Sequence, residues 1–254
     1  MVQHSAISWT DHTFNPWIGC TKVSPACDRC YAEAWAKRYG RAQWGDAPRQ
    51  RTSPATWRQP LKWNRETPGA FVFCASLADI FDNQVDPSWR ADAFTVMRAT
   101  PRLQWLLLTK RIANAVKLSE QAGGLPRNAA LGATVVTQAE ADRDAPKLIA
   151  AKQALGARFA FLSIEPMLER ISLDQAIRAP GFDGLLIDWV IVGGESGARA
   201  RPIHSNWVRA LRDECNAAGV PFHFKQWGGP TPKAGGKTID GREWCERPRM
   251  EQTA

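Results

Sequence analysis

Residues 104–110, QWLLLTK, form an apolar run that ends in two polar side chains. Similar runs recur along the chain, with stretches of helical pattern between them. We expect strands at 71–75, 104–108, 131–136, 159–164, 189–192 and 221–225. Their centres are 34, 27, 28, 29 and 32 residues apart, the spacing of a repeated strand–helix unit. Because the strands are almost continuously apolar, they predict an α/β fold with a parallel sheet covered on both faces.

A seventh strand is expected at 13–18, directly before a loop that contains cysteines. Two helix starts have clear punctuation. Asp86 followed by Pro87 is typical of a cap and a first helical residue, since proline has no amide hydrogen to leave unpaired. Ser205 is expected to cap a later helix, which glycine at 219 ends. Together these signals predict a partial (β/α) barrel of six or seven parallel strands.

We expect residues 1–254 to form one barrel domain, since the length suits a single large α/β unit. Residues 40–69 contain four prolines and few periodic apolar positions, so we interpret them as an irregular insertion. The Gly-, Pro- and Lys-rich segment from 228 is interpreted as a C-terminal tail. Pro146 should start or kink the helix that contains it. Without a long apolar run or a signal-like N-terminus, we expect a cytoplasmic protein.

Three of the six cysteines lie within eleven residues, where Cys20, Cys27 and Cys30 form a C-x6-C-x2-C pattern. Clustered cysteines in a chain of cytosolic character favour metal binding over disulfides. Three thiolates on one loop can hold three irons of a four-iron cluster and leave the fourth iron open to a small molecule. The pattern therefore predicts an iron–sulfur site.

Two other interpretations of this loop stay open. A structural zinc site could combine the three cysteines with His12, although zinc sites usually contain two separated ligand pairs. Alternatively, the three thiols could be ordinary buried side chains. Pro25, Asp28 and Arg29 speak against that interpretation, because they give the loop a polar, turn-like character.

The run NPWIGCTKVSPACDRCYA at 15–32 resembles the cysteine segment of radical S-adenosylmethionine (SAM) proteins related to spore photoproduct lyase. It resembles phage-associated three-Cys-motif proteins even more. The likeness continues in SLADIF at 76–81, LTKR at 108–111, SIEP at 163–166, GGES at 193–196 and KQWG at 225–228.

This resemblance implies a radical SAM-like barrel with a [4Fe-4S] cluster on Cys20, Cys27 and Cys30. The open iron would bind SAM, and an electron from a reductant such as flavodoxin or ferredoxin would cleave it to a 5′-deoxyadenosyl radical. Strand ends in such a barrel open onto one face. The SAM and substrate cavity is therefore expected to be lined by Tyr31, Ser76, Asp79, Thr109, Lys110, Ser163 and Glu165.

The sequence departs from the radical SAM pattern at two points. The usual cysteine loop is C-x3-C-x2-C, with an aromatic residue before the third cysteine, whereas this loop has three extra residues and Arg29 at that position. The superfamily's Gly-Gly-Glu segment, which holds the methionine amino group, follows the second strand. Here Gly-Gly-Glu at 193–195 follows a later strand, so we do not transfer that role to Glu195.

A basic, aromatic stretch follows the cysteine loop. The formal net charge is +8, and eight basic residues between 37 and 65 stand against the single acid Asp46. Basic groups beside flat aromatic ones suit nucleic acid, because phosphates take the charge and bases stack. The tryptophans could instead pack the insertion onto the barrel, with a solvated basic rim. The candidate contacts are Arg38, Arg41, Arg49, Arg51, Arg58 and Lys62.

These observations favour a radical SAM enzyme that acts on nucleic acid or a modified nucleotide. Two alternatives belong to other functional classes. The first is a zinc-stabilised nucleic-acid-binding module without catalysis. The second is a cluster-containing phage or host interaction protein that does not cleave SAM, since a fold alone does not establish an activity.

Overall fold

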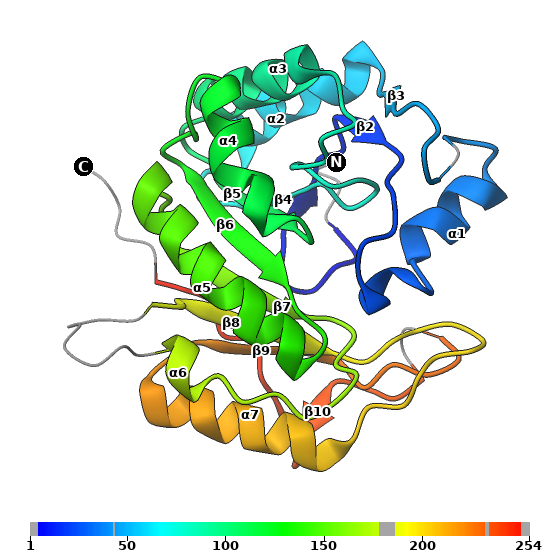
Figure 1. The fold of residues 1–254 in the computed structure, drawn as a ribbon, viewed down its shortest axis with the longest axis vertical. Helices are drawn as coiled ribbons and strands as arrows, with labels where there is room; N and C mark the ends of the chain where they lie inside the picture. Colours follow the sequence, from blue (N-terminus) through cyan, green and yellow to red (C-terminus); the bar gives the residue numbers. More distant parts are fainter. Residues whose placement is uncertain (1–4, 43, 178–185, 232–233, 250–254) are drawn as a thin grey trace. The chain divides into compact units, whose positions relative to one another are not determined.

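The computed structural model describes residues 5–42, 44–177, 186–231 and 234–249 (Figure 1). The chain divides into two compact units. Unit 1 comprises residues 1–134 and 147–159, and unit 2 comprises residues 135–146 and 160–254. The main sheet has seven strands in the order β1-β4-β5-β6-β7-β8-β9. This order, with helices between successive strands, confirms the predicted α/β half-barrel.

Unit 1 contains four parallel strands of the main sheet. They are β1 (His12–Thr13), β4 (Phe71–Cys74), β5 (Gln104–Thr109) and β6 (Ala129–Thr134). The strand expected at 13–18 is split. Its first part is β1, while β2 (Trp17–Ile18) leaves the sheet and pairs antiparallel with β3 (Gln50–Arg51). The chain therefore turns away from the sheet just before the first cysteine.

Helices α2, α3 and α4 of unit 1 lie near these strands, whereas α1 lies apart from them (Figure 1). They are α1 (Tyr31–Arg38), α2 (Pro54–Glu66), α3 (Pro87–Arg98) and α4 (Ala115–Gln121), with short 3₁₀ turns η1 (Pro25–Cys27) and η2 (Ile112–Asn114). The predicted start of α3 is confirmed: the Asp86 carboxylate accepts a hydrogen bond from the Ser88 amide at 2.8 Å, and Pro87 is the first helical residue.

Helix α2 corrects the second half of the interpretation of residues 40–69 as irregular, because Pro54–Glu66 are helical. Ser53 caps it by accepting a hydrogen bond from the Thr56 amide, and Pro54 occupies the first helical position, where no amide donor is needed. Pro60 lies inside the helix, on the side that buries Trp63. Burial of that tryptophan offsets the hydrogen bond that Pro60 cannot donate. Counting prolines without regard to their helical position led to the wrong prediction.

Unit 2 contains β7 (Ala160–Ile164), β8 (Trp189–Gly193) and β9 (Phe222–Gln226), which pair in parallel. Helix α6 (Asp174–Ile177) contacts α7 (Ser205–Ala218), which also contacts β9. His204, rather than Ser205, is the cap of α7, and Gly219 ends the helix with a φ of +72°. Helix α5 (Gln138–Leu155) contains residues of both units and continues through Pro146, so it does not begin there.

The segment after 228 is more ordered than a tail. It forms an antiparallel hairpin of β10 (Thr238–Ile239) and β11 (Arg242–Glu243), and then runs beside β9. The Phe224 amide donates to the Trp244 carbonyl at 2.8 Å, and the Trp189 indole donates to the Glu246 carbonyl at 2.9 Å. These bonds cover the outer edge of β9.

None of the helices in the described part of the chain combines the length and apolar character that a membrane-spanning helix requires. The apolar side chains are instead gathered in the interior. Trp105 and Leu106 of β5 and Trp189 and Val190 of β8 are fully buried.

Candidate functional site

The cysteine loop leads from β2 to the start of α1 in unit 1. Gly19 has a φ of +113°, a backbone conformation that favours glycine, and it turns the chain into Cys20. The Ser24 hydroxyl accepts from the Ala26 amide and starts η1, which ends at the buried Cys27. Cys30 occupies the N-cap position of α1. All three cysteines are free thiols.

Asn15, at the start of the motif, ties this loop to the loop that follows β4. Its amide nitrogen donates to the Ser76 hydroxyl at 3.0 Å, and its side-chain oxygen accepts from the Leu77 amide at 2.7 Å. The Gly19 amide donates to the Leu77 carbonyl at 3.2 Å, and the Tyr31 hydroxyl donates to the Ser76 carbonyl at 2.7 Å. Ser76 and Tyr31, both predicted to line a cofactor cavity, thus help to fix the loop.

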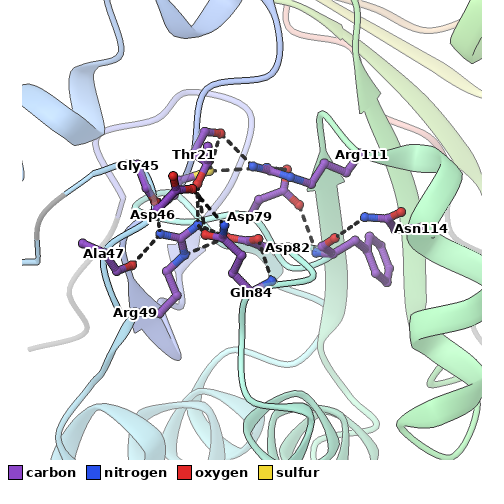
Figure 2. A network of polar contacts seen from close by, with 12 residues as sticks. Thr21, Gly45, Asp46, Ala47, Arg49, Asp79, Asp82, Gln84, Arg111 and Asn114 are labelled. Atoms are coloured by element: carbon purple, nitrogen blue, oxygen red, sulfur yellow. Dashed lines mark hydrogen bonds and ion pairs between the residues drawn. The ribbon is translucent and has the colours of Figure 1, made fainter.

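Asp79 organises the loops after β4 and β5 (Figure 2). Its buried carboxylate accepts from the Thr109 hydroxyl at 2.6 Å, the Lys110 amide at 3.0 Å and the Phe81 amide at 2.9 Å. It also pairs with the Arg111 guanidinium at 3.1 Å. Three predicted cavity residues, Asp79, Thr109 and Lys110, therefore meet at one place, where Lys110 contributes its backbone.

Arg111 links this carboxylate to the cysteine loop. Its guanidinium donates to the Cys20 sulfur at 3.4 Å and to the Thr21 carbonyl at 2.7 Å. Burial lowers the pKa of Arg111, but the charge of Asp79 and the contact with Cys20 outweigh burial and raise the pKa above its ordinary value. Arg111 stays charged at any physiological pH.

The surroundings of Cys20 favour its protonated form. Burial and, after it, the nearby Asp79 carboxylate raise the pKa of the Cys20 thiol, Arg111 opposes both, and the net pKa is about 11. In the metal-free protein the thiol therefore carries its proton at neutral pH. Metal binding to this sulfur would have to release that proton.

Arg49 lies in the interior, which corrects its assignment to a nucleic-acid surface. Its guanidinium pairs with Asp82 at 2.7 Å, with both side chains 1% exposed. It also donates to the carbonyls of Gly45 at 2.7 Å and Ala47 at 3.0 Å (Figure 2). Because its donors are directed to protein acceptors, Arg49 orders the segment before α2 and is not available to phosphate.

The other predicted nucleic-acid contacts are exposed on unit 1. Arg51 lies over the Trp57 ring, 4.3 Å from its centroid, and pairs with Asp92 at 2.7 Å. The remaining exposed candidates are Arg38, Arg41, Arg58 and Lys62.

The two candidates of unit 2 contact each other at the end of β7. The Ser163 hydroxyl donates to the Glu165 carboxylate at 3.2 Å, and the Lys225 ammonium pairs with that carboxylate at 2.9 Å. A Cβ on Gly193 would lie 3.0 Å from Glu165 Oε1, so a larger residue there would crowd the pair. Lys225 thus joins the candidates that the sequence pattern identified.

The Gly-Gly-Glu segment supports the backbone of unit 2. A Cβ on Gly194 would lie 2.0 Å from the Trp227 carbonyl oxygen, and one on Gly228 would lie 2.1 Å from the Glu195 carbonyl oxygen. The buried Glu195 pairs with Arg201 at 2.7 Å. Two segments of the backbone approach each other closely here, so there is no room for a side chain at Gly194 or Gly228.

His12 is committed elsewhere, which removes the proposed fourth ligand of a zinc site. Its ring stacks on Trp63 with centroids 4.5 Å apart, and its Nε2 bonds to the Thr67 hydroxyl at 2.9 Å. In the part of the chain that the structure describes, no three His, Cys, Asp or Glu side chains are arranged around a common metal position. The three free thiols suit iron by their chemistry, but they are not gathered as ligands.

A family profile described as "Protein of unknown function (DUF5131)" matches residues 4–248. The chain belongs to this family. The DUF5131 chain matches no curated protein sequence.

Solved structures of spore photoproduct lyase share the fold of this DUF5131 protein. A cysteine-to-serine mutant matches with a TM-score of 0.51 at 13% sequence identity, over 84% of this chain and 63% of that one. A double mutant with bound AdoMet and dinucleoside spore photoproduct matches with a TM-score of 0.50 at 13% identity, with the same coverage. The DUF5131 chain thus has the half-barrel fold of spore photoproduct lyase and spans about 63% of the length of these structures.

Proposed function

We propose that this DUF5131 protein is a radical SAM-type iron–sulfur enzyme that acts on nucleic acid or a modified nucleotide. The observation that carries the proposal is the position of three free cysteines on one loop after β1 in a half-barrel of this kind. Strands β1 and β4 run parallel, so the loops that follow them meet at the same edge of the sheet, where Gly19 pairs with Ala78. Barrel enzymes place their chemistry at this edge.

Cys20, Cys27 and Cys30 would hold three irons of a four-iron cluster. When bound, such a cluster supplies the electron for reductive cleavage of SAM. Arg111 holds the Cys20 sulfur, and its positive charge would compensate thiolate charge there. Asp79 in turn fixes Arg111, so the two residues form a polar support beneath the loop.

The contacts of the predicted cavity residues separate them by role. Ser76, Asp79 and Thr109 spend their polar atoms on loop–loop hydrogen bonds, so we assign them a supporting role. For Lys110, the described residues include no ion-pair partner, and its ammonium suits a carboxylate or phosphate. Ser163 and Glu165 also stay proposed contacts to SAM or substrate. The Tyr31 hydroxyl is bonded to the Ser76 carbonyl, so its exposed ring is the part that stays a proposed contact. A flavodoxin- or ferredoxin-like reductant and an association with phage belong to the same proposal.

Iron counting and a cleavage assay test this proposal together. The protein is purified without oxygen and reconstituted, iron and sulfide are counted, and 5′-deoxyadenosine is measured after incubation with SAM and a reductant. We expect about four irons per chain, the content of one cubane cluster, and formation of 5′-deoxyadenosine. Replacement of Cys20, Cys27 and Cys30 by alanine should abolish both.

Cys245→Ala is the matched control, because Cys245 is an exposed free thiol outside the loop. It should retain iron and cleavage. Unchanged iron content in the triple variant would contradict the proposal. One zinc per chain without SAM cleavage would instead support a metal-stabilised binding protein.

A further inference from the structure

Unit 1 has two open surface hollows with similar chemistry. Their volumes are about 370 Å³ and 310 Å³, within the usual range for small-ligand sites. The α1 hollow is lined by Glu33, Ala36, Lys37, Gly40, Arg41, Ala42 and Trp44. The α2 hollow is lined by Arg51, Thr52, Pro54, Trp57 and Arg58. Each hollow thus combines two basic side chains with a tryptophan.

In the α2 hollow, an aromatic surface and a cation lie together. Arg51 stacks over the Trp57 ring at 4.3 Å and pairs with Asp92, with side chains 38% and 52% exposed. Such an exposed pair contributes little and can exchange partners. Arg58 is exposed, and the described residues contain no ion-pair partner for it. Pro54 begins a helix of 13 residues, whose N-terminal amides add positive potential.

The α1 hollow repeats the arrangement. Lys37 pairs with Glu33 at 2.8 Å, so the positive charge of Lys37 is compensated within the protein. Arg41 is exposed, and among the residues described by the structure it has no acidic partner. Trp44, three residues later, is half-buried and contributes its ring to the lining. One uncompensated guanidinium and one indole therefore face the same space.

These features together select a ligand class. An uncompensated arginine suits a phosphate, and a flat indole or a stacked guanidinium suits a nucleobase. Bases can reach such a surface only when they are unstacked from a partner strand. Two hollows of this kind on one unit favour a chain that carries phosphates and bases repeatedly.

We propose that the two hollows bind single-stranded nucleic acid, with phosphates at Arg41 and Arg58 and bases against Trp44 and the Arg51–Trp57 stack. The inference rests on the proposed function in that the bound strand would present the substrate. It adds which surface holds the strand and which strand form is recognised.

Binding of the reconstituted full-length protein to labelled oligonucleotides of about 12 nucleotides tests this inference. Single-stranded DNA, single-stranded RNA and duplex DNA are compared from low to moderate salt. We expect single strands to bind at least about tenfold tighter than duplex. Arg58→Ala and Arg41→Ala should each weaken binding about three- to tenfold and reduce the magnitude of the salt slope by about 0.7, the contribution of one phosphate contact.

Arg65→Ala is the matched control, because Arg65 is an exposed arginine in the last turn of α2, outside the lining of the hollow. Equal weakening by Arg65→Ala and Arg58→Ala would overturn the inference, since bulk charge would then explain binding. Absence of single-strand binding, or equal binding of duplex, would also overturn it. Binding of either single-stranded DNA or single-stranded RNA supports the inference. The difference between their affinities shows whether deoxyribose or ribose is preferred.

A second variant separates this inference from the proposed function. Cys20→Ala should lose iron but keep oligonucleotide binding, because Cys20 does not line either hollow. If the protein contains iron and cleaves SAM but does not bind a strand, the proposed role of the hollows is wrong, whereas the proposed enzyme class is unaffected. Strand binding, lost in Arg58→Ala but without iron in any preparation, would support the hollows and contradict the enzyme class.

Discussion

Arg49 and Arg51 are two residues apart in the same basic stretch, yet their surroundings are opposite. Each pairs with an aspartate at 2.7 Å. The Arg49–Asp82 pair is buried, with both side chains 1% exposed, whereas the Arg51–Asp92 pair is 38% and 52% exposed. The same ion-pair distance therefore occurs once in the interior and once in water.

The difference shows that a charge count overstates a binding surface. A buried guanidinium is needed by the carboxylate beside it, because an isolated buried charge is strongly destabilising. An exposed pair contributes about 0–1 kcal/mol and is screened by salt. Arg49 consequently stabilises the fold of unit 1, whereas Arg51 is available for contacts at its surface.

The largest expected effect is that of Arg49→Ala. The substitution leaves the Asp82 carboxylate buried without its guanidinium, so we expect the free energy of unfolding to fall by about 3–5 kcal/mol. Urea denaturation followed by circular dichroism measures this loss. Arg65→Ala, which removes an exposed arginine from α2, should change the free energy by less than about 0.5 kcal/mol. Equal losses in the two variants would invalidate the distinction between buried and exposed arginines.

Buried and exposed histidines should also differ in their effect on stability, and the pH dependence of the free energy of unfolding shows this difference. Burial lowers the pKa of His223 from 6.5 to about 4. Above pH 6.5 neither the folded nor the unfolded state binds this proton. As the pH falls from 6.5 to 4, the unfolded state is protonated first, and stability should fall by about 3 kcal/mol in total.

Denaturation at several pH values, compared between the wild type and His223→Gln, isolates this contribution. The variant should lose less stability between pH 6.5 and 4. His204→Gln is the matched control, because His204 is the exposed cap of α7, and it should retain the wild-type slope. A wild-type slope in His223→Gln would show that other groups cause the pH dependence.

The smallest expected effect is that of Arg51→Ala on stability. The substitution removes an exposed ion pair with Asp92 and a cation–π contact with Trp57, each of which contributes at most about 1 kcal/mol. We expect the free energy of unfolding to fall by at most about 2 kcal/mol in urea denaturation, less than for Arg49→Ala. A loss as large as that of Arg49→Ala would mean that Arg51 supports the fold as well.

The predicted strands illustrate how far local pattern reaches. The runs predicted from 71, 104 and 189 begin at the first residues of β4, β5 and β8, and the other three runs begin within two residues of β6, β7 and β9. Local signals also identified the start of α3 and the end of α7, because capping depends on residues adjacent in sequence. Val208, Leu211 and Cys215 form the buried face of α7, with the spacing of an amphipathic helix.

The residues that support the cysteine loop could not be predicted from local sequence patterns. Arg111 stands 91 residues from Cys20, and only the meeting of loops after parallel strands brings its guanidinium to that sulfur. Its position directly after a predicted strand end was the signal available in the sequence. Likewise, the importance of Asp79 arises from donors about 30 residues away.

The sequence alone determined the alternation of strands and helices, the capped helix ends and the presence of three clustered thiols, because each depends on residues close together in the chain. The tertiary structure decided which polar residues are supports and which are exposed. Arg49 and Arg51 show why: burial and pairing depend on Asp82 and Asp92, which only folding brings near. A charge acquires its energetic role from the dielectric and the partners around it, and neither is encoded locally.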